Sequence, residues 1–377
     1  MKFLDNLSRA FQSDNSETRN STAPPNVPQG ITIGRYRLRV VKLLEEGGFG
    51  YVYACVDENT NRQFALKKVN TQDKERYSAS IREAKLLTKF TAVKNSKIIK
   101  CYGYKEMRSQ RSNSKFIYIL MELARGGNMV NEMNKRWDNR FSEKEILKIF
   151  HDTCIGVAVM HSFEHPIFHR DLKVENILNM GRGEYRLCDF GSASTKALMT
   201  SSSREAMCDA EGVIDKNTTL AYRSPEMVDL YSGDVINEKG DIWALGCILY
   251  KLAYYVGPFE DGAKLQLMQC RYKKPEAMKP KFSKKFTDLI NLLLLKDPKA
   301  RPDIFTVLDL ICELRQVKNT VSKPKHLIER KSKQFDNKSA PTSSLNPSTK
   351  KKATKKKSAP KKKGRFVFST SVAIGRW

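Results

Sequence analysis

Residues 169–176 read HRDLKVEN and residues 189–191 read DFG, in a chain of 377 residues. Each piece alone occurs often by chance and is usually no more than a turn. Together, in this order and at this separation, they place a carboxylate, a cation and two oxygen ligands on neighbouring loops. This combination decides the fold, because it is typical of enzymes that transfer a phosphoryl group from ATP.

The side chains of the stretch suit that reaction. Its transition state spreads charge over the phosphoryl oxygens, so the protein mainly positions the reactants and neutralises charge. Asp171 is expected to accept the proton of the attacking hydroxyl, and Lys173 to point toward the moving phosphate. Asn176 and Asp189 supply the hard oxygen ligands that Mg²⁺ prefers, with water and phosphate oxygens as its other ligands. The sequence therefore predicts one catalytic site that uses ATP and Mg²⁺.

A glycine-rich segment upstream predicts the nucleotide site. Residues 44–53 (LEEGGFGYVY) lie between strand-like stretches at 36–44 and 51–56, so we expect a hairpin over the phosphates. A glycine lets backbone N–H groups approach a phosphate without a Cβ in the way. Alone, such a loop is more often a plain hairpin, and Glu45 stands where these loops usually have their first glycine. The predicted nucleotide contacts here are Leu44, Glu45, Glu46, Gly47, Gly48, Phe49, Gly50 and Val52, with Ala65 on the next strand.

Lys67 ends the apolar run 64–67 and is placed to reach the α- and β-phosphates. It needs an anionic partner to hold it. Glu83, in the amphipathic segment 78–90, is the candidate, although a solvated helix charge is the simpler alternative for such a glutamate. Lys67 and Glu83 therefore join Asp171, Lys173, Asn176 and Asp189 as the predicted catalytic residues.

The predicted elements come as strands first and helices second. Strand-like runs cover 36–44, 51–56, 63–69, 98–104 and 116–121 around one helix, and helical periodicity then dominates at 142–161, 239–255, 281–295 and 304–318. This order predicts an α+β, two-lobed fold with a small β-rich N-lobe and a larger α-helical C-lobe.

The nucleotide is expected between the two lobes, against a linker that contains Glu122, Leu123 and Ala124. Met121, just before the linker, would shape the back of the pocket, but it could equally be plain core packing.

Composition divides the chain into four parts: an unstructured arm at 1–34, the N-lobe and hinge at 35–124, the C-lobe at 125–315 and a lysine-rich disordered tail at 316–377. The eight cysteines are scattered without a Cys-x-x-Cys pair, which favours reduced thiols in a cytosolic protein. No stretch is apolar enough to span a bilayer and the N-terminus lacks a secretory signal, so we expect a soluble, cytoplasmic protein.

Both arms carry little structural signal. In the first, Phe3, Leu4, Leu7 and Phe11 recur at helical spacing and are compatible with a membrane surface or a groove, but disorder is the expected state. The tail 317–377 holds 18 Lys and Arg against 2 Asp and Glu, a net +16 of the chain's +27. Nuclear import, nucleic-acid contact and attachment to anionic membrane remain open as uses of this charge.

The chain resembles a eukaryotic protein kinase of the Numb-associated kinase family, and is most similar to the branch of the cyclin-G-associated kinases. The resemblance covers nearly all of residues 31–315 and is carried by the stretches 44–53, 169–178, 187–193, 217–232, 241–247 and 258–265. The branch assignment rests on DLYS at 229–232 and EDGAKL at 260–265.

The resemblance implies further roles. Glu226, in Ser-Pro-Glu, would pair with Arg301, and Asp241 would hold the backbone of the catalytic loop. Lys173 together with Thr219 implies a serine/threonine kinase. Similar kinases fold an extra helix between residues 189 and 226 and need no phosphorylation there. The residues themselves also allow a polar loop, with hydroxyls at 200–203 whose phosphates could pair with Arg170.

The resemblance also implies protein substrates with Ser/Thr acceptors, among them clathrin-adaptor or endocytic proteins, and a place in the cytoplasm or at vesicle and membrane surfaces. The basic tail leaves a nuclear fraction open. The alternative function is a non-catalytic, kinase-shaped scaffold whose tail binds anionic membrane or nucleic acid. Degeneration at the base or metal positions would favour the scaffold, and those positions are intact.

Overall fold

The computed structural model describes residues 30–47, 50–71, 73–108, 115–199, 203–259 and 264–328. The predictions for Gly48 and Phe49, for the hydroxyls at 200–202, for the run 260–263 and for most of both arms lie outside these residues.

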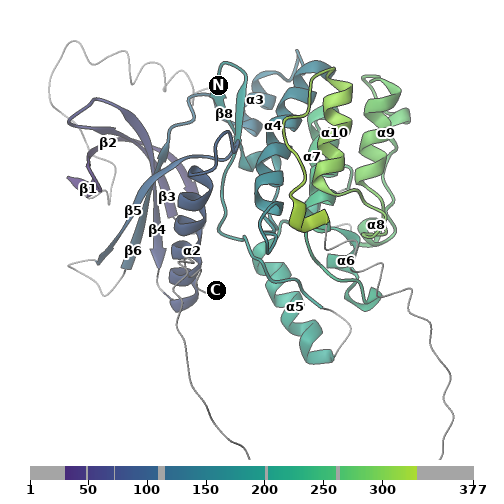
Figure 1. Ribbon diagram of the computed structural model, residues 1–377, viewed down its shortest axis with the longest axis horizontal. Helices are drawn as coiled ribbons and strands as arrows, with labels where there is room; N and C mark the ends of the chain where they lie inside the picture. Colours follow the sequence, from purple (N-terminus) through teal and green to yellow (C-terminus); the bar gives the residue numbers. More distant parts are fainter. Residues whose placement is uncertain are drawn as a thin grey trace, which may run out of the picture. The chain divides into compact units, whose positions relative to one another are not determined.

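An antiparallel six-stranded sheet forms the N-lobe (Figure 1). Its strands follow the order β1-β2-β3-β4-β6-β5, and one helix, α2, packs beside the sheet. The helix begins after Asp73, whose side chain accepts a hydrogen bond from the backbone N–H of Arg76. The bounds are β1 Ile31–Ile33, β2 Tyr36–Gly47, β3 Gly50–Asp57, β4 Gln63–Thr71, β5 Cys101–Arg108, β6 Lys115–Glu122 and α2 Lys74–Thr91.

Two predictions for the N-lobe are corrected. Ile31 and Ile33, assigned to an unstructured arm, form β1, and each is only 2% exposed. They are ordered because they cover an aromatic core that includes Tyr36, Phe64 and Tyr118. The strand expected at 98–104 begins only at 101. Residues 98 and 99 instead pair with Leu187 of the C-lobe, so these residues connect the lobes.

The C-lobe is mainly helical, with α7 at its centre. Fourteen residues of α7 are buried, which agrees with its nearly continuous apolar sequence. A small three-stranded sheet, β7-β8-β9, carries the catalytic segments. The bounds are β7 Gly127–Asn128, α3 Met129–Lys135, α4 Glu143–His161, β8 Ile177–Gly181, β9 Glu184–Leu187, α5 Arg204–Asn217, α6 Pro225–Val228, α7 Lys239–Tyr254, α8 Lys264–Met268, α9 Lys284–Leu293 and α10 Ile304–Leu314.

Residues beyond α10 pack on the C-lobe, so the tail predicted from 316 begins too early. Lys323 donates to Asp303, the N-cap of α10, across 2.5 Å. Val321 and Leu327 are partly buried against the main core. The ion pair and these two apolar contacts order a segment whose composition alone favours disorder.

All eight cysteines lie among the described residues and are free. Cys208, on α5, is the exposed one; Cys188 and Cys270 are partly buried and the other five are buried. Within the described ranges no helix combines the length and apolar character that crossing a membrane requires.

Gly246 tests the packing of α7 against α9. A Cβ at this position would lie 2.9 Å from the Cβ of Leu293 and 2.8 Å from Cδ2 of Leu294. We expect Gly246→Ala to lower the free energy of unfolding by about 1–3 kcal/mol, because an added methyl overpacks the core. Denaturant unfolding of the full chain measures this change.

Gly212 of α5 is the matched control, because a Cβ there meets nothing within 4 Å. Gly212→Ala should be neutral or stabilise the protein by up to about 1 kcal/mol, as alanine favours a helix over glycine. Equal effects of the two substitutions would contradict the packing argument.

Candidate active site

Lys67 joins the two lobes at the predicted nucleotide site. Its Nζ lies 2.7 Å from Oε1 of Glu83 on α2 and 3.0 Å from Oδ1 of Asp189 in the segment after β9. The β4 register places Lys67 between Val52 of β3 and Ile119 of β6. Three predicted catalytic residues from distant parts of the sequence therefore meet.

The charges of this cluster are suited to a polyphosphate and a divalent cation. Lys67 lowers the pKa of Asp189 to about 2, so Asp189 is a carboxylate at neutral pH. Burial would lower the pKa of Lys67, but Asp189 and Glu83 outweigh it and the net pKa is raised, so Lys67 stays an ammonium. Glu83 holds Lys67 in place, while Asp189 remains partly exposed.

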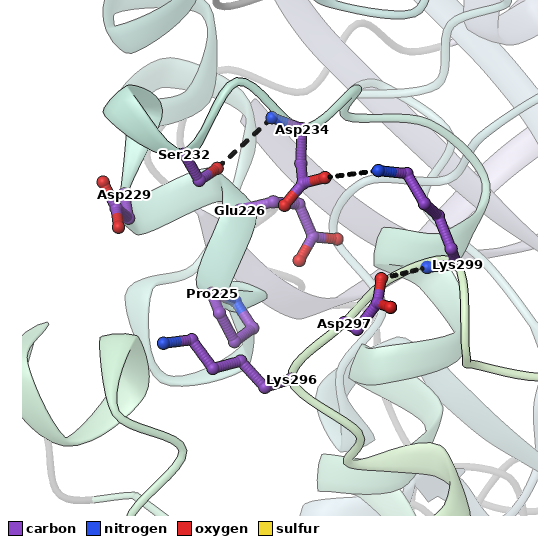
Figure 2. Close-up of a pocket in the computed structure, with 8 residues that line it drawn as sticks. All are labelled: Pro225, Glu226, Asp229, Ser232, Asp234, Lys296, Asp297 and Lys299. Carbon is purple, nitrogen blue, oxygen red and sulfur yellow. Dashed lines mark hydrogen bonds and ion pairs between the residues drawn. The ribbon is translucent and has the colours of Figure 1, made fainter.

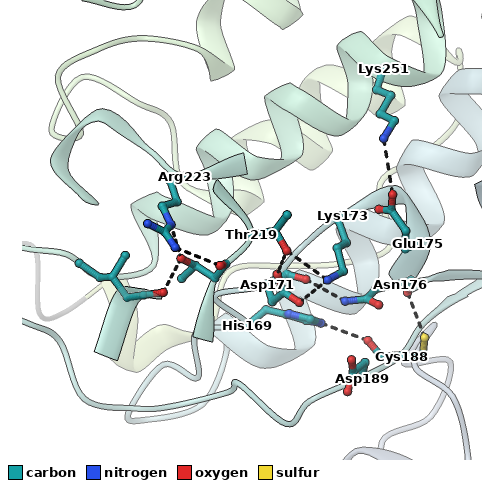
Figure 3. Close-up of polar contacts among 12 residues, drawn as sticks. His169, Asp171, Lys173, Glu175, Asn176, Cys188, Asp189, Thr219, Arg223 and Lys251 are labelled. Carbon is teal, nitrogen blue, oxygen red and sulfur yellow. Dashed lines mark hydrogen bonds and ion pairs between the residues drawn. The ribbon is translucent and has the colours of Figure 1, made fainter. Parts of the chain in front are cut away.

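Asp171 is held by two neighbours, Thr219 and Lys173 (Figure 3). Thr219 donates from Oγ1 to one carboxylate oxygen across 2.7 Å, and Lys173 donates from Nζ to the other across 2.7 Å. Lys173 also donates to Thr219 Oγ1 across 3.1 Å. These contacts fix the orientation of the Asp171 carboxylate.

The Asn176 side chain is suited to bind a metal ion. Its side-chain N–H donates to the backbone carbonyl of Asp171 across 2.8 Å, and this contact directs the amide oxygen the other way. That oxygen and the Asp189 carboxylate are the kind of hard donors that Mg²⁺ takes. The donor set therefore suits a magnesium ion that also binds phosphate oxygens.

A buried carboxylate holds the loop that carries Asp171. Asp241, at the start of α7, accepts hydrogen bonds from the backbone N–H groups of His169 (2.8 Å) and Arg170 (3.0 Å), as the resemblance implies. It also lies 2.9 Å from Nε2 of His161. Arg170 has φ +70°, so its backbone needs this support.

Phe190 sets the direction of Asp189. Its ring is fully buried and its centroid lies 5.2 Å from both Phe90 of α2 and His169. Asp189 itself has φ +62°. With Phe190 packed between the lobes, the neighbouring carboxylate points to Lys67.

The glycine-rich hairpin and the linker are described except for Gly48 and Phe49. Leu44, Glu45, Glu46 and Gly47 end β2, Gly50 and Val52 begin β3, and Ala65 pairs with Met121 across β4 and β6. A Cβ on Gly50 would lie 2.1 Å from the carbonyl oxygen of Lys68. Gly50 is therefore required by the approach of β4, a reason that the sequence did not reveal.

The Glu122 side chain is directed away from the predicted nucleotide position. Its Oε1 accepts from the backbone N–H of Lys100 across 2.8 Å and bonds Arg186 of β9. Its backbone N–H donates to the Lys100 carbonyl. The side chain is therefore engaged by the Lys100 backbone and by Arg186, and the prediction that Glu122 contacts the nucleotide stays a prediction. Ala124 follows it, and its carbonyl accepts from Gly127 N–H across 3.2 Å.

The activation segment ends on a buried ion pair. Arg301 donates to both carboxylate oxygens of Glu226 across 2.7 Å, and both side chains are at most 1% exposed. A cavity of about 410 Å³ lies beside Glu226, and Figure 2 shows the residues that line it. It is lined by Pro225, Glu226, Asp229, Ser232, Asp234, Lys296, Asp297 and Lys299. No predicted nucleotide or catalytic residue lines this cavity.

A β-rich lobe, a helical lobe, and a Lys-Glu-Asp cluster joining them define a protein kinase domain. Residues 38–310 match the family model of the protein kinase domain, and the chain belongs to this family.

The chain is similar to curated relatives over most of its own length. A probable serine/threonine-protein kinase of Dictyostelium discoideum is 41% identical over 83% of this chain and 38% of that protein. A second from the same organism is 42% identical over 77% of this chain and 25% of its own length. Actin-regulating kinase 1 of Saccharomyces cerevisiae is 36% identical over 78% of this chain and 46% of that protein. The chain thus spans less than half of each relative.

Thr219 tests the geometry around Asp171. We expect Thr219→Ala to lower kcat for a peptide substrate about 10- to 100-fold. A positioned general base contributes about 10²–10⁴-fold, and Lys173 still holds Asp171 in this variant, so only part of that contribution is lost. KM for ATP should change little, since the contacts of Thr219 are with Asp171 and Lys173 and not with Lys67. Thr219→Ser keeps the hydroxyl and should restore most of kcat; failure of this rescue would argue against the hydroxyl contact.

Arg301 tests the anchor of the activation segment. Arg301→Met should destabilise the protein by about 3–5 kcal/mol, because it leaves the Glu226 carboxylate buried without its cation. Thermal and denaturant unfolding measure the loss. Lys285→Met, which breaks an exposed pair with Glu313, is the control and should cost at most about 1 kcal/mol. Similar losses in both variants would refute the buried anchor.

Proposed function

We propose that this chain is a serine/threonine protein kinase that transfers the γ-phosphoryl group of ATP to Ser/Thr hydroxyls of protein substrates. Two clusters of side chains carry the proposal. Lys67 contacts Glu83 and Asp189, and Asp171 contacts Lys173 and Thr219. The first suits a metal-bound triphosphate, and the second suits a hydroxyl acceptor.

Each residue of the site has a separate role in the proposed reaction. Lys67 binds the α- and β-phosphates, and Glu83 keeps its ammonium in position. Asp171 accepts the proton of the attacking hydroxyl, and Lys173 neutralises charge on the phosphoryl oxygens beside it. Asp189 and Asn176 would hold Mg²⁺, which would supply positive charge to the phosphates. The chain has all six predicted catalytic residues, which disfavours a non-catalytic scaffold. They are Lys67, Glu83, Asp171, Lys173, Asn176 and Asp189.

The family branch we propose is the Numb-associated kinases, with endocytic or clathrin-adaptor proteins as substrates. Helix α5, at Arg204–Asn217, supports this placement, because the resemblance implies an extra helix in the activation segment. A yeast relative, 36% identical over 78% of this chain, is named as an actin-regulating kinase.

We propose that the lysine-rich tail determines where in the cell the enzyme binds. Near an anionic leaflet each Lys contributes about 1 kcal/mol, so a handful of these residues would hold the enzyme on the cytoplasmic surface of a vesicle. Nucleic acid is negatively charged like an anionic leaflet, and binding of the tail to nucleic acid would place a fraction of the enzyme in the nucleus instead.

A radiolabelled ATP assay on the purified chain tests the activity. We expect phosphate on serine or threonine of a general protein substrate and a loss of at least about 100-fold in Asp189→Asn. A chain that ends at 328, the last residue that the structure describes, should keep full activity. Activity that survives Asp189→Asn would contradict the site.

The tail is tested separately. Salt-sensitive binding of the full chain to phosphatidylserine vesicles, lost in the chain ending at 328, would support membrane addressing. Preference for duplex DNA at equal salt would overturn it.

A further inference from the structure

A strongly basic segment lies at the end of the C-lobe that points away from the N-lobe sheet (Figure 1). Residues 271–285, which we call the basic segment, follow α8 and include the first two residues of α9. They contain one acidic side chain and seven basic ones, all seven exposed. The basic residues are Arg271, Lys273, Lys274, Lys279, Lys281, Lys284 and Lys285. Charge of one sign at this density creates a positive potential over this end of the domain.

Little of this charge is neutralised within the protein. The one acid of the segment, Glu276, accepts a hydrogen bond from the side chain of Asn291 across 2.9 Å. Two of the basic side chains, those of Lys284 and Lys285, have carboxylate partners, in exposed pairs. The other five have no carboxylate partner among the residues that the structure describes. The basic segment therefore presents uncompensated positive charge to the solvent.

The backbone of the basic segment is held to the core of the C-lobe. Tyr250 of α7 donates from its hydroxyl to the carbonyl of Lys273 across 2.9 Å, and Tyr254 donates to the carbonyl of Pro275 across 3.4 Å. Pro275 is itself buried. The basic side chains are thus attached to an ordered chain, so binding a partner does not require the backbone to be ordered first.

The aromatic side chains of the segment argue against a nucleic-acid partner. The Tyr272 ring lies 5.6 Å from that of Phe259, and the ammonium of Lys274 lies 4.1 Å from its centroid. The Phe282 ring is stacked on Phe286 at 4.8 Å. Both rings are engaged within the protein, whereas single-stranded nucleic acid is bound by stacking its bases on open aromatic rings.

The same side chains argue against a protein partner. Tyr272, Met278 and Phe282 are the large apolar residues of the segment, and each is partly buried against the main core. The surface that remains is charged, while the centre of a protein interface is depleted of charged residues and rich in apolar ones. Lysine ammonium groups act as point charges, which suits the headgroups of an anionic leaflet.

We propose that the basic segment binds an anionic phospholipid leaflet as a second contact beside the lysine-rich tail. This proposal rests on the proposed attachment of the tail, which would hold the segment near the leaflet and so raise its effective concentration there. Because the segment lies away from the N-lobe sheet (Figure 1), a leaflet bound to it leaves the contact of Lys67 with Asp189 uncovered.

Binding of the full chain to phosphatidylcholine vesicles, with and without phosphatidylserine, tests the proposal at about 0.15 M salt. One variant combines Arg271→Gln, Lys273→Gln, Lys274→Gln and Lys279→Gln. Each basic residue near an anionic leaflet contributes about fivefold to the binding constant. We therefore expect the combined variant to bind vesicles that contain phosphatidylserine at least about 25-fold more weakly, the effect of two residues in contact.

The matched control removes the same charges, one arginine and three lysines, from exposed positions of the N-lobe. It combines Arg39→Gln, Lys74→Gln, Lys94→Gln and Lys105→Gln. Its affinity should stay within about threefold of the unaltered chain, because charges more than about 8 Å from the leaflet are screened. Equal losses in the two variants would overturn the proposal, since net charge would then account for the binding. An unaltered affinity in the segment variant would overturn it as well.

Acetylation of lysines on the unaltered chain, read by mass spectrometry, needs no substitution. Vesicles with phosphatidylserine should slow the modification of Lys273, Lys274 and Lys279 and leave that of Lys94 and Lys105 unchanged. Protection of the first three by duplex DNA but not by vesicles would overturn the proposal. If the unaltered chain does not bind these vesicles at all, the proposed attachment of the tail fails too, whereas binding without protection contradicts the role of the basic segment alone.

Discussion

The ammonium of Lys67 is the constraint on which the rest of the site depends. It lies within hydrogen-bond distance of carboxylates from α2 and from the segment after β9. If α2 turned away, Glu83 would be left buried without its cation, a costly state. If Phe190 left its place between Phe90 and His169, Asp189 would lose its direction. The positions of helix, sheet and catalytic loop are therefore coupled through one side chain.

Sequence reasoning succeeded where chemistry is encoded over a short span. Asp171, Lys173 and Asn176 lie within six residues, so their proximity follows from the chain itself. Helix periodicity likewise predicted α4 and α7 almost to the residue. Lys67 could be predicted because it ends an apolar run, and Glu83 because it lies in an amphipathic segment nearby and can supply the anionic partner that Lys67 needs. In each case the signal is local, and the structure adds distances.

What the sequence could not predict depends on partners far along the chain. The three residues of β1 are too few for an alternation signal, and their burial comes from the aromatic face that they cover. The Glu122 side chain bonds Arg186, 64 residues later. Lys323 is ordered by Asp303 in a stretch whose composition favours disorder. None of these contacts has a spacing that a pattern can detect.

Helix α5 is held mainly at its C-terminal end. Ile214 is buried against Met227 and Ile236, and Arg223 donates to Asp215 across 2.6 Å. The pair of Lys216 with Glu75 of α2 is exposed and contributes at most about 1 kcal/mol. Burial raises the pKa of the Cys55 thiol to about 12 and also that of Cys188 and Cys247, so few thiolates form there. A maleimide dye would thus attach first at Cys208, and its fluorescence would follow this one helix while the remaining thiols stay unlabelled.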